Sequence, residues 1–426
     1  MKNLFKLSLL IFAFLGFSSH TKQSAPSNSC LFTVLKDDKS GYINSKGELI
    51  VSCIYDKIET YKLPTCSNGY ISFKKNGAWG VMDLTGKVII EAKYKNEVNF
   101  NEYGYAAVTI KEVGEDGDED EDDWYAALDF GFDDKYIIID KTGKKIMEKE
   151  YQTPVFSGGL NGQYFIYKLD DNTQGFINLK TKTECSKTFY TIKSFENGKA
   201  IAQTEKSGNY GVIDDKGNWI IQPKYYSINT IEDNNQYQVS DAGNSPVWKI
   251  IDNTGKVVAG PFGKYKRDFF FSYSKFSKEG LLVVQDTVTK LWGFMNQTGK
   301  IAIACKYTKV NSFYEGKAMV CEGGKVEQGY FGTINIIGGN WKCINTTGSV
   351  LFSLADLDDA GNFSEGRCSV QTEELWGFID ASGKYIVNPK FKKAPGYFTN
   401  GLSKIEKDDA IGYIDINGKY VWEPSK

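Results

Sequence analysis

The alternation of apolar and polar side chains in residues 375–384 predicts a strand that runs into a tight turn. Successive side chains of a strand point to opposite faces, so Trp376, Phe378 and Asp380 share one face. The Asp-x-x-Gly step that follows fits a three-residue hairpin, in which Asp bonds the backbone of the turn and Gly takes the left-handed position. A second strand at 384–387 completes this predicted hairpin.

The same pattern recurs along the chain in about ten units. Most intervals between successive copies are 35 to 39 residues, and one interval of 57 residues holds an insertion. A Pro-Lys-aromatic step follows the second strand, as in 389–391, and a Phe-x-x-Gly step precedes another short strand, as in 313–318. We therefore expect three or four short strands per unit. The Asp or Asn that opens each turn stands at positions 44, 83, 140, 178, 214, 252, 296, 345, 380 and 415.

These recurring motifs resemble those of the bacterial WG repeat family. The resemblance rests on the Trp-Gly-aromatic-Ile-Asp-x-x-Gly-Lys core, the Pro-Lys-Tyr step and the Phe-x-Glu-Gly-x-Ala element. It spans roughly residues 31–426 and is most specific at Trp79, Trp292 and Trp376. It implies tandem β-hairpin units that pack on their neighbours. It implies no particular activity, because members of the family are mostly of unknown function.

Each predicted hairpin is too small to bury a core by itself, so neighbouring units must complete one another. The sequence therefore predicts a single all-β array over residues 31–426. Two arrangements fit this prediction, namely an open, twisted, solenoid-like array and a closed β-propeller-like ring. The unequal lengths of the units favour the open array.

Residues 1–18 are typical of a secretory signal peptide. Lys2 and Lys6 form a basic start, and residues 7–17 form an apolar run that is too short to span a bilayer. Cleavage after Ser18 would place small residues at both specificity positions.

Cleavage there leaves residues 19–30 as a short linker before the repeats. Lipidation of Cys30 is a weaker alternative, because no apolar residue stands before it where a lipidation signal needs one. We expect an exported protein, found in the periplasm, at the cell surface or outside the cell. No later stretch is apolar enough to predict a membrane-spanning segment.

The composition argues against the common classes of enzyme. The only histidine, His20, lies beside the predicted cleavage site, so the array has no imidazole for a catalytic triad or a metal site. The sequence also contains no P-loop and no G-x-S-x-G elbow. We predict no catalytic, cofactor-binding or metal-binding residues and no cofactor. A net charge of −2 predicts no general attraction to nucleic acid.

Residues 111–124 form an acidic insertion. Nine carboxylates and no basic residue stand between Glu112 and Asp123. The main interpretation is a solvated loop between units, and weak association with divalent cations is the alternative. An EF-hand is excluded, because Glu121 stands where its loop needs Gly and Ala127 where it needs an acid.

The eight cysteines are interpreted mainly as small apolar residues. Alignment of the units puts Cys53 and Cys305 at a proline slot, and Cys343 and Cys368 at slots that other units fill with apolar residues. If a disulfide forms, Cys53–Cys66 is the expected pair.

The function predicted from these patterns is a non-catalytic, exported module that binds a protein or glycan partner, or has a structural role, at the cell envelope. The recurring Trp is expected to pack between neighbouring units, and stacking on a ligand is the alternative. A carbohydrate-active enzyme with paired carboxylates is the alternative function, and an adhesive spacer is a third.

Overall fold

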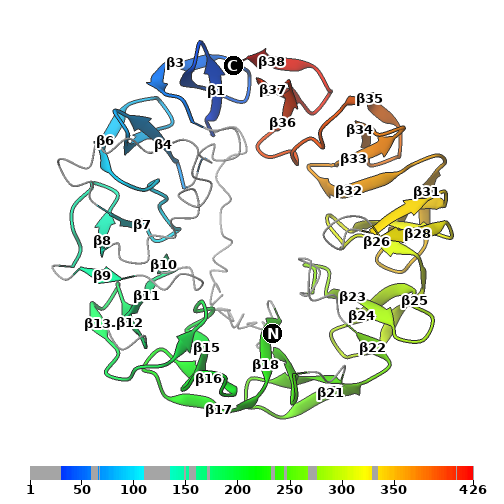
Figure 1. Ribbon diagram of the computed structural model, residues 1–426, viewed down its shortest axis with the longest axis horizontal. Helices are drawn as coiled ribbons and strands as arrows, with labels where there is room; N and C mark the ends of the chain where they lie inside the picture. Colours follow the sequence, from blue (N-terminus) through cyan, green and yellow to red (C-terminus); the bar gives the residue numbers. More distant parts are fainter. Residues whose placement is uncertain are drawn as a thin grey trace, which may run out of the picture.

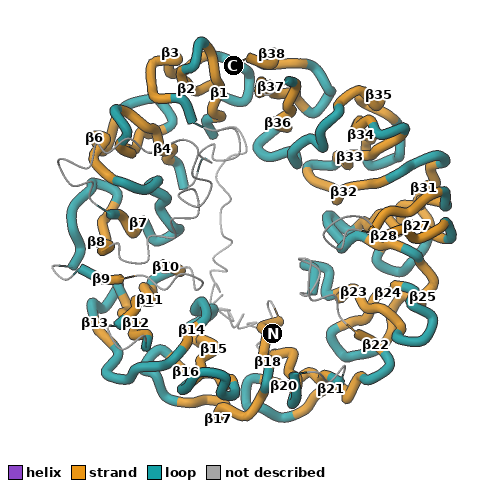
Figure 2. The backbone as a smooth tube through the Cα atoms, in the orientation of Figure 1, coloured by secondary structure: helices purple, strands orange, loops and turns teal. Residues whose placement is uncertain are grey.

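The computed structural model describes residues 30–58, 66, 68–109, 135–147, 150–152, 160–169, 173–231, 236–243, 247–266, 276–328, 334–408 and 410–425. Within these ranges every regular element is a β-strand (Figure 2). The strands belong to ten repeat units, which follow one another in chain order.

The first five units contain 17 strands. They are unit 1 with β1 (Phe32–Lys36), β2 (Lys39–Ile43) and β3 (Leu49–Asp56); unit 2 with β4 (Tyr70–Lys75), β5 (Ala78–Asp83) and β6 (Val88–Tyr94); unit 3 with β7 (Tyr105–Val108), β8 (Lys135–Asp140) and β9 (Tyr151–Gln152); unit 4 with β10 (Leu160–Asn161), β11 (Tyr164–Lys168), β12 (Gln174–Asn178) and β13 (Thr183–Glu184); and unit 5 with β14 (Thr191–Ile192), β15 (Lys199–Gln203), β16 (Tyr210–Asp214) and β17 (Trp219–Tyr225).

The last five units contain the remaining strands. They are unit 6 with β18 (Ser227–Ile231), β19 (Gln236–Ser240), β20 (Trp248–Asp252) and β21 (Val257–Phe262); unit 7 with β22 (Tyr265–Lys266), β23 (Leu281–Asp286), β24 (Trp292–Asn296) and β25 (Ile301–Tyr307); unit 8 with β26 (Lys309–Val310), β27 (Lys317–Glu322), β28 (Lys325–Gln328), β29 (Ile334–Ile337), β30 (Asn340–Asn345) and β31 (Val350–Leu354); unit 9 with β32 (Asp359–Ser364), β33 (Arg367–Thr372), β34 (Leu375–Asp380) and β35 (Tyr385–Phe391); and unit 10 with β36 (Leu402–Lys407), β37 (Ala410–Asp415) and β38 (Tyr420–Ser425).

The sheets are antiparallel and stand side by side around a ring, with strands such as β17, β25 and β35 on the outside (Figure 1). Among the described residues the ring contains nine sheets, because units 3 and 4 join into one seven-stranded sheet through the pair Lys168↔Gln152. The hairpin β28–β29 is a separate two-stranded sheet inserted between β27 and β30.

The predicted hairpin turn is confirmed. Asp380 Oδ1 accepts hydrogen bonds from the backbone N–H groups of Ser382 (2.8 Å) and Lys384 (3.0 Å), and Gly383 has φ +87°. Unit 4 has Thr181 at the Gly slot, and the positive φ, of 57°, falls on the next residue, Lys182. Asn178 Oδ1 there accepts from the N–H groups of Lys180 and Thr181, so the turn conformation changes where the Gly is missing.

The Gly of the Trp-Gly pair lies against the outer strand of its own sheet. A Cβ on Gly377 would stand 2.4 Å from the carbonyl oxygen of Val387. The pairing of β34 with β35 shifts register at this point, as a β-bulge does. In unit 8, where Lys342 replaces the Gly, the pairing runs without a shift through Lys342↔Ser353. In unit 6, however, Lys249 replaces the Gly and a register shift remains between Trp248 and Ile250, so the bulge does not require Gly in every unit.

The Gly of the hairpin turn lies against the unit before it. A Cβ on Gly383 would meet the ring of Phe352 at 2.5 Å, and one on Gly418 would meet Val387 at 2.3 Å. The contact also closes the ring, because the corresponding Gly47 of unit 1 faces Val421 of unit 10, 2.3 Å from its carbonyl oxygen.

Side chains of the first and last units complete the closure. The Tyr413 hydroxyl is buried and donates a hydrogen bond of 2.9 Å to the carbonyl oxygen of Thr33, and Val34 and Leu402 share one apolar cluster. In Figure 1 the chain's first strand, β1, lies beside β38. The structure therefore corrects the favoured open array and has the closed, propeller-like ring that was the alternative.

Unequal unit lengths did not prevent closure, because the extra residues lie between strands. In unit 3 the pair Val108↔Ile137 brings β7 and β8 together on either side of residues 109–134. In unit 8 the extra length forms the hairpin β28–β29. The packed part of each unit keeps its size, which is what a ring needs. The acidic insertion at 111–124 lies wholly outside the described residues, as do residues 1–18 and 19–29.

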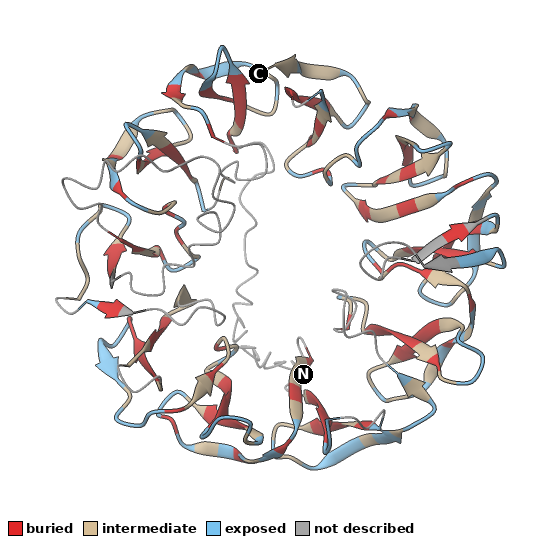
Figure 3. Ribbon diagram, in the orientation of Figure 1, coloured by how far each residue is buried: buried red, intermediate tan, exposed pale blue. Residues whose placement is uncertain are grey.

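The core consists of clusters that neighbouring units share. Figure 3 shows buried residues along the strands all around the ring. Phe378 of unit 9 packs with Phe398 and Ile414 of unit 10, and Trp376 lies partly buried against this same cluster. The predicted position of this Trp between neighbouring units is confirmed.

The cysteines follow the predicted packing in part. Cys343 and Cys368 are fully buried thiols in one cluster, as expected. The expected Cys53–Cys66 bridge is wrong: Cys66 bonds to Cys30, with their Cα atoms 5.6 Å apart, and Cys53 is free. The physical reason is that the Cys53 sulfur lies against Gly41, on the neighbouring strand of its own sheet.

Within the described residues, no helix is long and apolar enough to cross a membrane.

Candidate functional site

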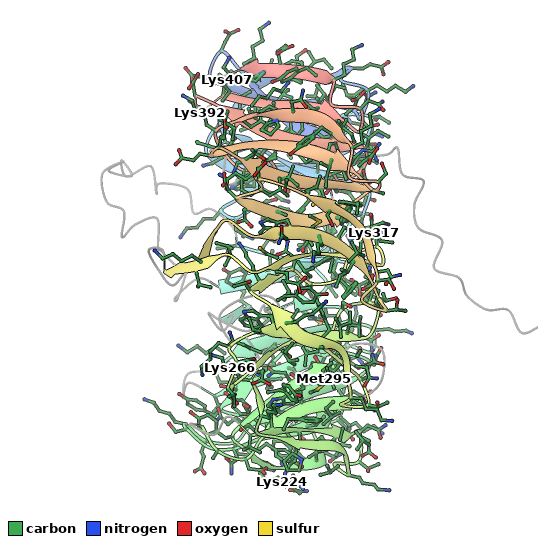
Figure 4. The ribbon with its side chains drawn as sticks, turned by 90° about the vertical axis from the view of Figure 1, so that its right-hand side faces the viewer. Lys224, Lys266, Met295, Lys317, Lys392 and Lys407 are labelled. Atoms are coloured by element: carbon green, nitrogen blue, oxygen red, sulfur yellow. A yellow bond between two sulfur atoms is a disulfide. The ribbon has the colours of Figure 1, made fainter. Side chains whose placement is uncertain are left out.

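One face of the ring carries turns from successive units, and we call it the Gly-turn face. One kind is the hairpin turn. The other, present among the described residues of units 3 to 5 and 7 to 10, is the leading turn, which ends at a Gly just before the strand that pairs with the Trp-Gly strand; it is the Phe-x-x-Gly step in units 5, 8, 9 and 10 and has one more residue in units 3 and 7. Register places them together, because Lys317 directly after one leading turn pairs with Asn345 at the hairpin turn. Figure 4, a side view, shows Lys317 on the edge of the ring opposite Lys392 and Lys407.

In units 7 to 10 the leading turns are tied to one another by glutamates. Glu279 Oε1 accepts from the N–H of Gly316 at 2.9 Å. The two oxygens of Glu315 accept from the N–H groups of Glu365 (2.7 Å) and Gly366 (2.9 Å). Glu365 in turn accepts from the N–H of Gly401 at 2.8 Å. These carboxylates are therefore used for joining successive units.

The leading turns of units 3 and 4 meet differently. Asn101 Nδ2 donates to the carbonyl oxygen of Gly162, which joins the two turns through a side-chain amide. Tyr103, directly before the turn Gly, is 53% exposed, and a Cβ on Gly162 would lie 3.4 Å from its ring. The Tyr103 ring and the Glu102 carboxylate thus stand over the turn of the next unit.

A cavity of about 460 Å³ opens at this place on the Gly-turn face. Its volume is within the range of small-molecule binding sites. It is bounded by the leading turns of three successive units, which supply aromatic rings, carboxylates, amides and exposed backbone. The lining residues are Glu102, Tyr103, Asn161, Gly162, Gln163, Tyr164, Phe195, Glu196, Asn197 and Gly198.

The inner wall of this cavity is held by packed aromatic rings. Tyr164 and Phe195 stack with their centroids 4.2 Å apart and an interplanar angle of 19°, and both are buried. Phe176 packs on Phe195 from below at 4.7 Å. A wall built on buried strands keeps its shape, which suits a binding site.

The electrostatics of the cavity are acidic. Burial raises the pKa of the Tyr164 hydroxyl, and the charge of Asp215 raises this pKa further, whereas a hydrogen bond from Gln163 opposes the shift. Burial, followed by the charge of Glu196, raises the pKa of the nearby Tyr237 to about 12. Both phenols therefore remain neutral hydrogen-bonding groups at physiological pH.

This arrangement can bind a ligand with hydroxyl groups. The amides of Asn161, Gln163 and Asn197 offer donors and acceptors, the two carboxylates accept, and the exposed Tyr103 ring offers an apolar face. The cavity is unlike the recurring Trp positions, because it adds Tyr103, Asn161 and Gln163 to the Phe and Gly of the recurring leading turn.

No binding residue is predicted from the sequence, and the repeat pattern gives no indication of this cavity. The available signal was a departure from the repeat: units 8 and 9 have Glu315 and Glu365 before the turn Gly, and unit 3 has Tyr103 there.

A second, smaller cavity lies in unit 6. It measures about 300 Å³ and is lined mainly by apolar side chains, among them Val247, Trp248 and Pro261. The ion pair between Lys249 and Asp241, at 2.7 Å, contributes to its lining. With few polar groups left to orient a ligand, it is the weaker candidate.

The comparison with protein families decides the identity of the repeat. A model described as WG containing repeat matches six segments, at residues 41–77, 79–112, 210–237, 292–325, 343–376 and 376–409. This chain is a WG-repeat protein. Residues 113–209 lie between two of these matched segments and are not themselves matched. Eight of the ten cavity residues, all except Glu102 and Tyr103, belong to this unmatched stretch.

Solved structures match this chain with low sequence identity and with TM-scores below 0.5. A eukaryotic initiation factor matches with 11% identity and a TM-score of 0.49, covering 92% of this chain and 94% of that one. The computationally designed Ika8 protein matches with 10% identity and a TM-score of 0.35, covering 76% and 93%. BamB from Moraxella catarrhalis matches with 10% identity and a TM-score of 0.29, covering 82% and 92%. No curated protein matches the sequence.

Proposed function

We propose that this WG-repeat protein is an exported, non-catalytic binding module whose ligand is a glycan, held in the cavity between the leading turns of units 3 to 5. The observation that carries the proposal is the composition of the cavity. Aromatic, amide and carboxylate groups converge there on a rigid wall, and a saccharide offers matching apolar faces and hydroxyl groups.

The repeat architecture supports a binding or structural role. Each unit adds the same framework, and ligand contacts come from turn residues that vary between units, as in other repeat proteins. The cavity residues lie mostly in the stretch that departs from the family pattern, whereas the framework Gly and Asp residues persist there, as at Gly143 and Asp140.

Export is supported by the pattern of residues 1–18 and by the Cys30–Cys66 disulfide, since disulfides persist in oxidising compartments. The expected result is a mature chain that starts at Ser19 and is recovered from the cell envelope or the medium. Terminal sequencing of the native protein checks this, and an uncleaved chain in the cytoplasm would contradict it.

Binding is tested with a glycan array, followed by titration calorimetry of the best saccharide with the parent and with Tyr103→Ala. We expect Tyr103→Ala to weaken binding at least tenfold, because stacking on an exposed ring is lost. The matched control is Tyr314→Ala, which removes an exposed tyrosine from the leading turn of unit 8. Equal losses in both variants, or no binding of any saccharide by the parent, would contradict the proposal.

A carbohydrate-active enzyme is the second candidate, and one observation favours it: Glu102 and Glu196 line the same cavity, as an acid and its partner do in glycosidases. Release of reducing ends from the bound saccharide, abolished by Glu102→Gln, would establish this activity. Unchanged saccharide after prolonged incubation with the parent supports the binding module.

A further inference from the structure

The carboxylates of the Gly-turn face have two different uses. In units 7 to 10, Glu279, Glu315 and Glu365 accept hydrogen bonds from backbone N–H groups of the next unit. In the cavity, Glu102 and Glu196 stand among the lining residues, and no lysine or arginine is part of that lining. The cavity thus presents two carboxylates and no cationic side chain among its described lining residues, and Lys199, which pairs with Glu196 at the leading turn of unit 5, lies just outside that lining.

Other groups add to the negative potential at this place. Asp215, in the hairpin turn of unit 5, is close enough to act on the Tyr164 hydroxyl of the inner wall. The exposed ring of Tyr103 adds the negative face of an aromatic system, which attracts cations. A cationic ligand would complement the charge of these carboxylates, which a neutral ligand would not do.

From this juxtaposition we propose that the cavity selects saccharides that carry a free, protonated amino group, with Glu102 and Glu196 as the groups that recognise the ammonium. This inference rests on the proposed function and specifies its ligand class. The sugar hydroxyls bond to the amides of Asn161, Gln163 and Asn197, and one sugar face lies on Tyr103.

The width of the site favours an amino sugar over a lysine side chain. The lining comes from three turns and offers amides from two of them, at Gln163 and Asn197. The thin aliphatic stem of a lysine would leave these amides unpaired, whereas the hydroxyls around a sugar ring can satisfy them.

The test is titration calorimetry of the full folded chain with three probes of equal length. They are a trimer of β-1,4-linked glucosamine, the same trimer with every amine acetylated, and a β-1,4-linked glucose trimer. At a pH where the amines are protonated, we expect the glucosamine trimer to bind about tenfold or more tightly than either neutral trimer, since hydrogen bonds to charged groups are the stronger ones. The preference should shrink as salt is added.

Two variants separate this inference from the proposed function. Glu196→Gln should remove most of the preference for the amine, measured as the ratio of the affinities for the glucosamine trimer and the acetylated trimer. Glu373→Gln, an exposed glutamate between β33 and β34 at the opposite end of the strands, matches the charge change and should retain the preference.

Equal binding of the charged and acetylated trimers, or a preference that persists in Glu196→Gln, would overturn the inference while leaving a glycan-binding cavity in place. No binding of any trimer, or binding that ignores Tyr103→Ala, would overturn the proposed function as well. Tighter binding of a lysine-rich peptide than of the glucosamine trimer would overturn the choice of a saccharide.

Discussion

The leading turns of units 3 and 7 have the same length and the same backbone hydrogen bond, yet their side chains make different contacts with the next unit. Both run from a buried Phe to a Gly four residues later, Phe100–Gly104 and Phe276–Gly280. In both, the Gly N–H donates to a carbonyl oxygen three residues earlier, at 2.9 Å. They differ in the residue before the Gly, which is Tyr103 in unit 3 and Glu279 in unit 7.

The difference shows how a repeat protein acquires a site without changing its framework. Glu279 accepts a hydrogen bond from the Gly316 N–H and so links the leading turns of units 7 and 8. Tyr103 stands over Gly162 and bounds the cavity instead. The same slot therefore links leading turns on one side of the ring and bounds the proposed binding cavity on the other.

The largest effect on stability is expected from replacing Trp376, which packs between units, and a much smaller one from replacing Tyr103, which bounds the cavity. Trp376→Ala should lower the free energy of unfolding by about 3 kcal/mol, near the low end for a large aromatic because Trp376 is partly exposed. The loss should fall first on units 9 and 10, since neighbours in an array share their cores. Tyr103→Ala should change stability by less than about 0.5 kcal/mol.

Thermal unfolding and limited proteolysis of the two variants check this prediction. Equal destabilisation by both substitutions would remove the distinction between packing aromatics and the aromatic of the cavity.

An exchange of the two slot residues should have an intermediate effect. Glu279→Tyr leaves the Gly316 N–H without its acceptor and should cost about 1 kcal/mol of stability. Tyr103→Glu should keep the stability of the parent and weaken saccharide binding at least tenfold. Lys278→Ala, in the same turn as Glu279, is the control for the first variant. Full affinity in Tyr103→Glu would show that the slot does not determine binding.

The smallest effect is expected on the acid sensitivity of unfolding, through the hairpin turns that occur all around the ring. A hydrogen bond from the hydroxyl of Thr85 lowers the pKa of Asp83, and one from Ser382 lowers the pKa of Asp380. A lowered pKa in the folded state gives stability that is complete above the unfolded value of about 3.9 and is lost as the pH falls below it.

Asp83→Asn and Asp380→Asn should therefore make unfolding slightly less sensitive to acid, and by equal amounts. Asn is compatible with the turn, because Asn44 accepts the same two backbone bonds in unit 1. Unfolding temperatures between pH 7 and pH 3 measure the effect. A larger change in one variant would mean that the two sides differ in more than their leading turns.

The sequence predicted the local structure well and the long-range structure poorly. The positive φ at Gly383 and the bonds of Asp380 follow from turn chemistry within five residues, so the motif alone was sufficient. Closure depends on contacts such as Tyr413 with Thr33, which lie 380 residues apart and have no local signature. The cavity combines three turns, and a pattern that seeks what the units share overlooks Tyr103.

The central claim is that ligands bind between units 3 and 5 and leave the glutamate-linked turns unaffected. Amide hydrogen exchange of the full chain, with and without the glucosamine trimer, tests it most directly. The account predicts slower exchange at 101–104, 161–164 and 195–198 and no change at 313–316, 363–366 and 398–401. Protection confined to the second set, or spread evenly around the ring, would contradict it.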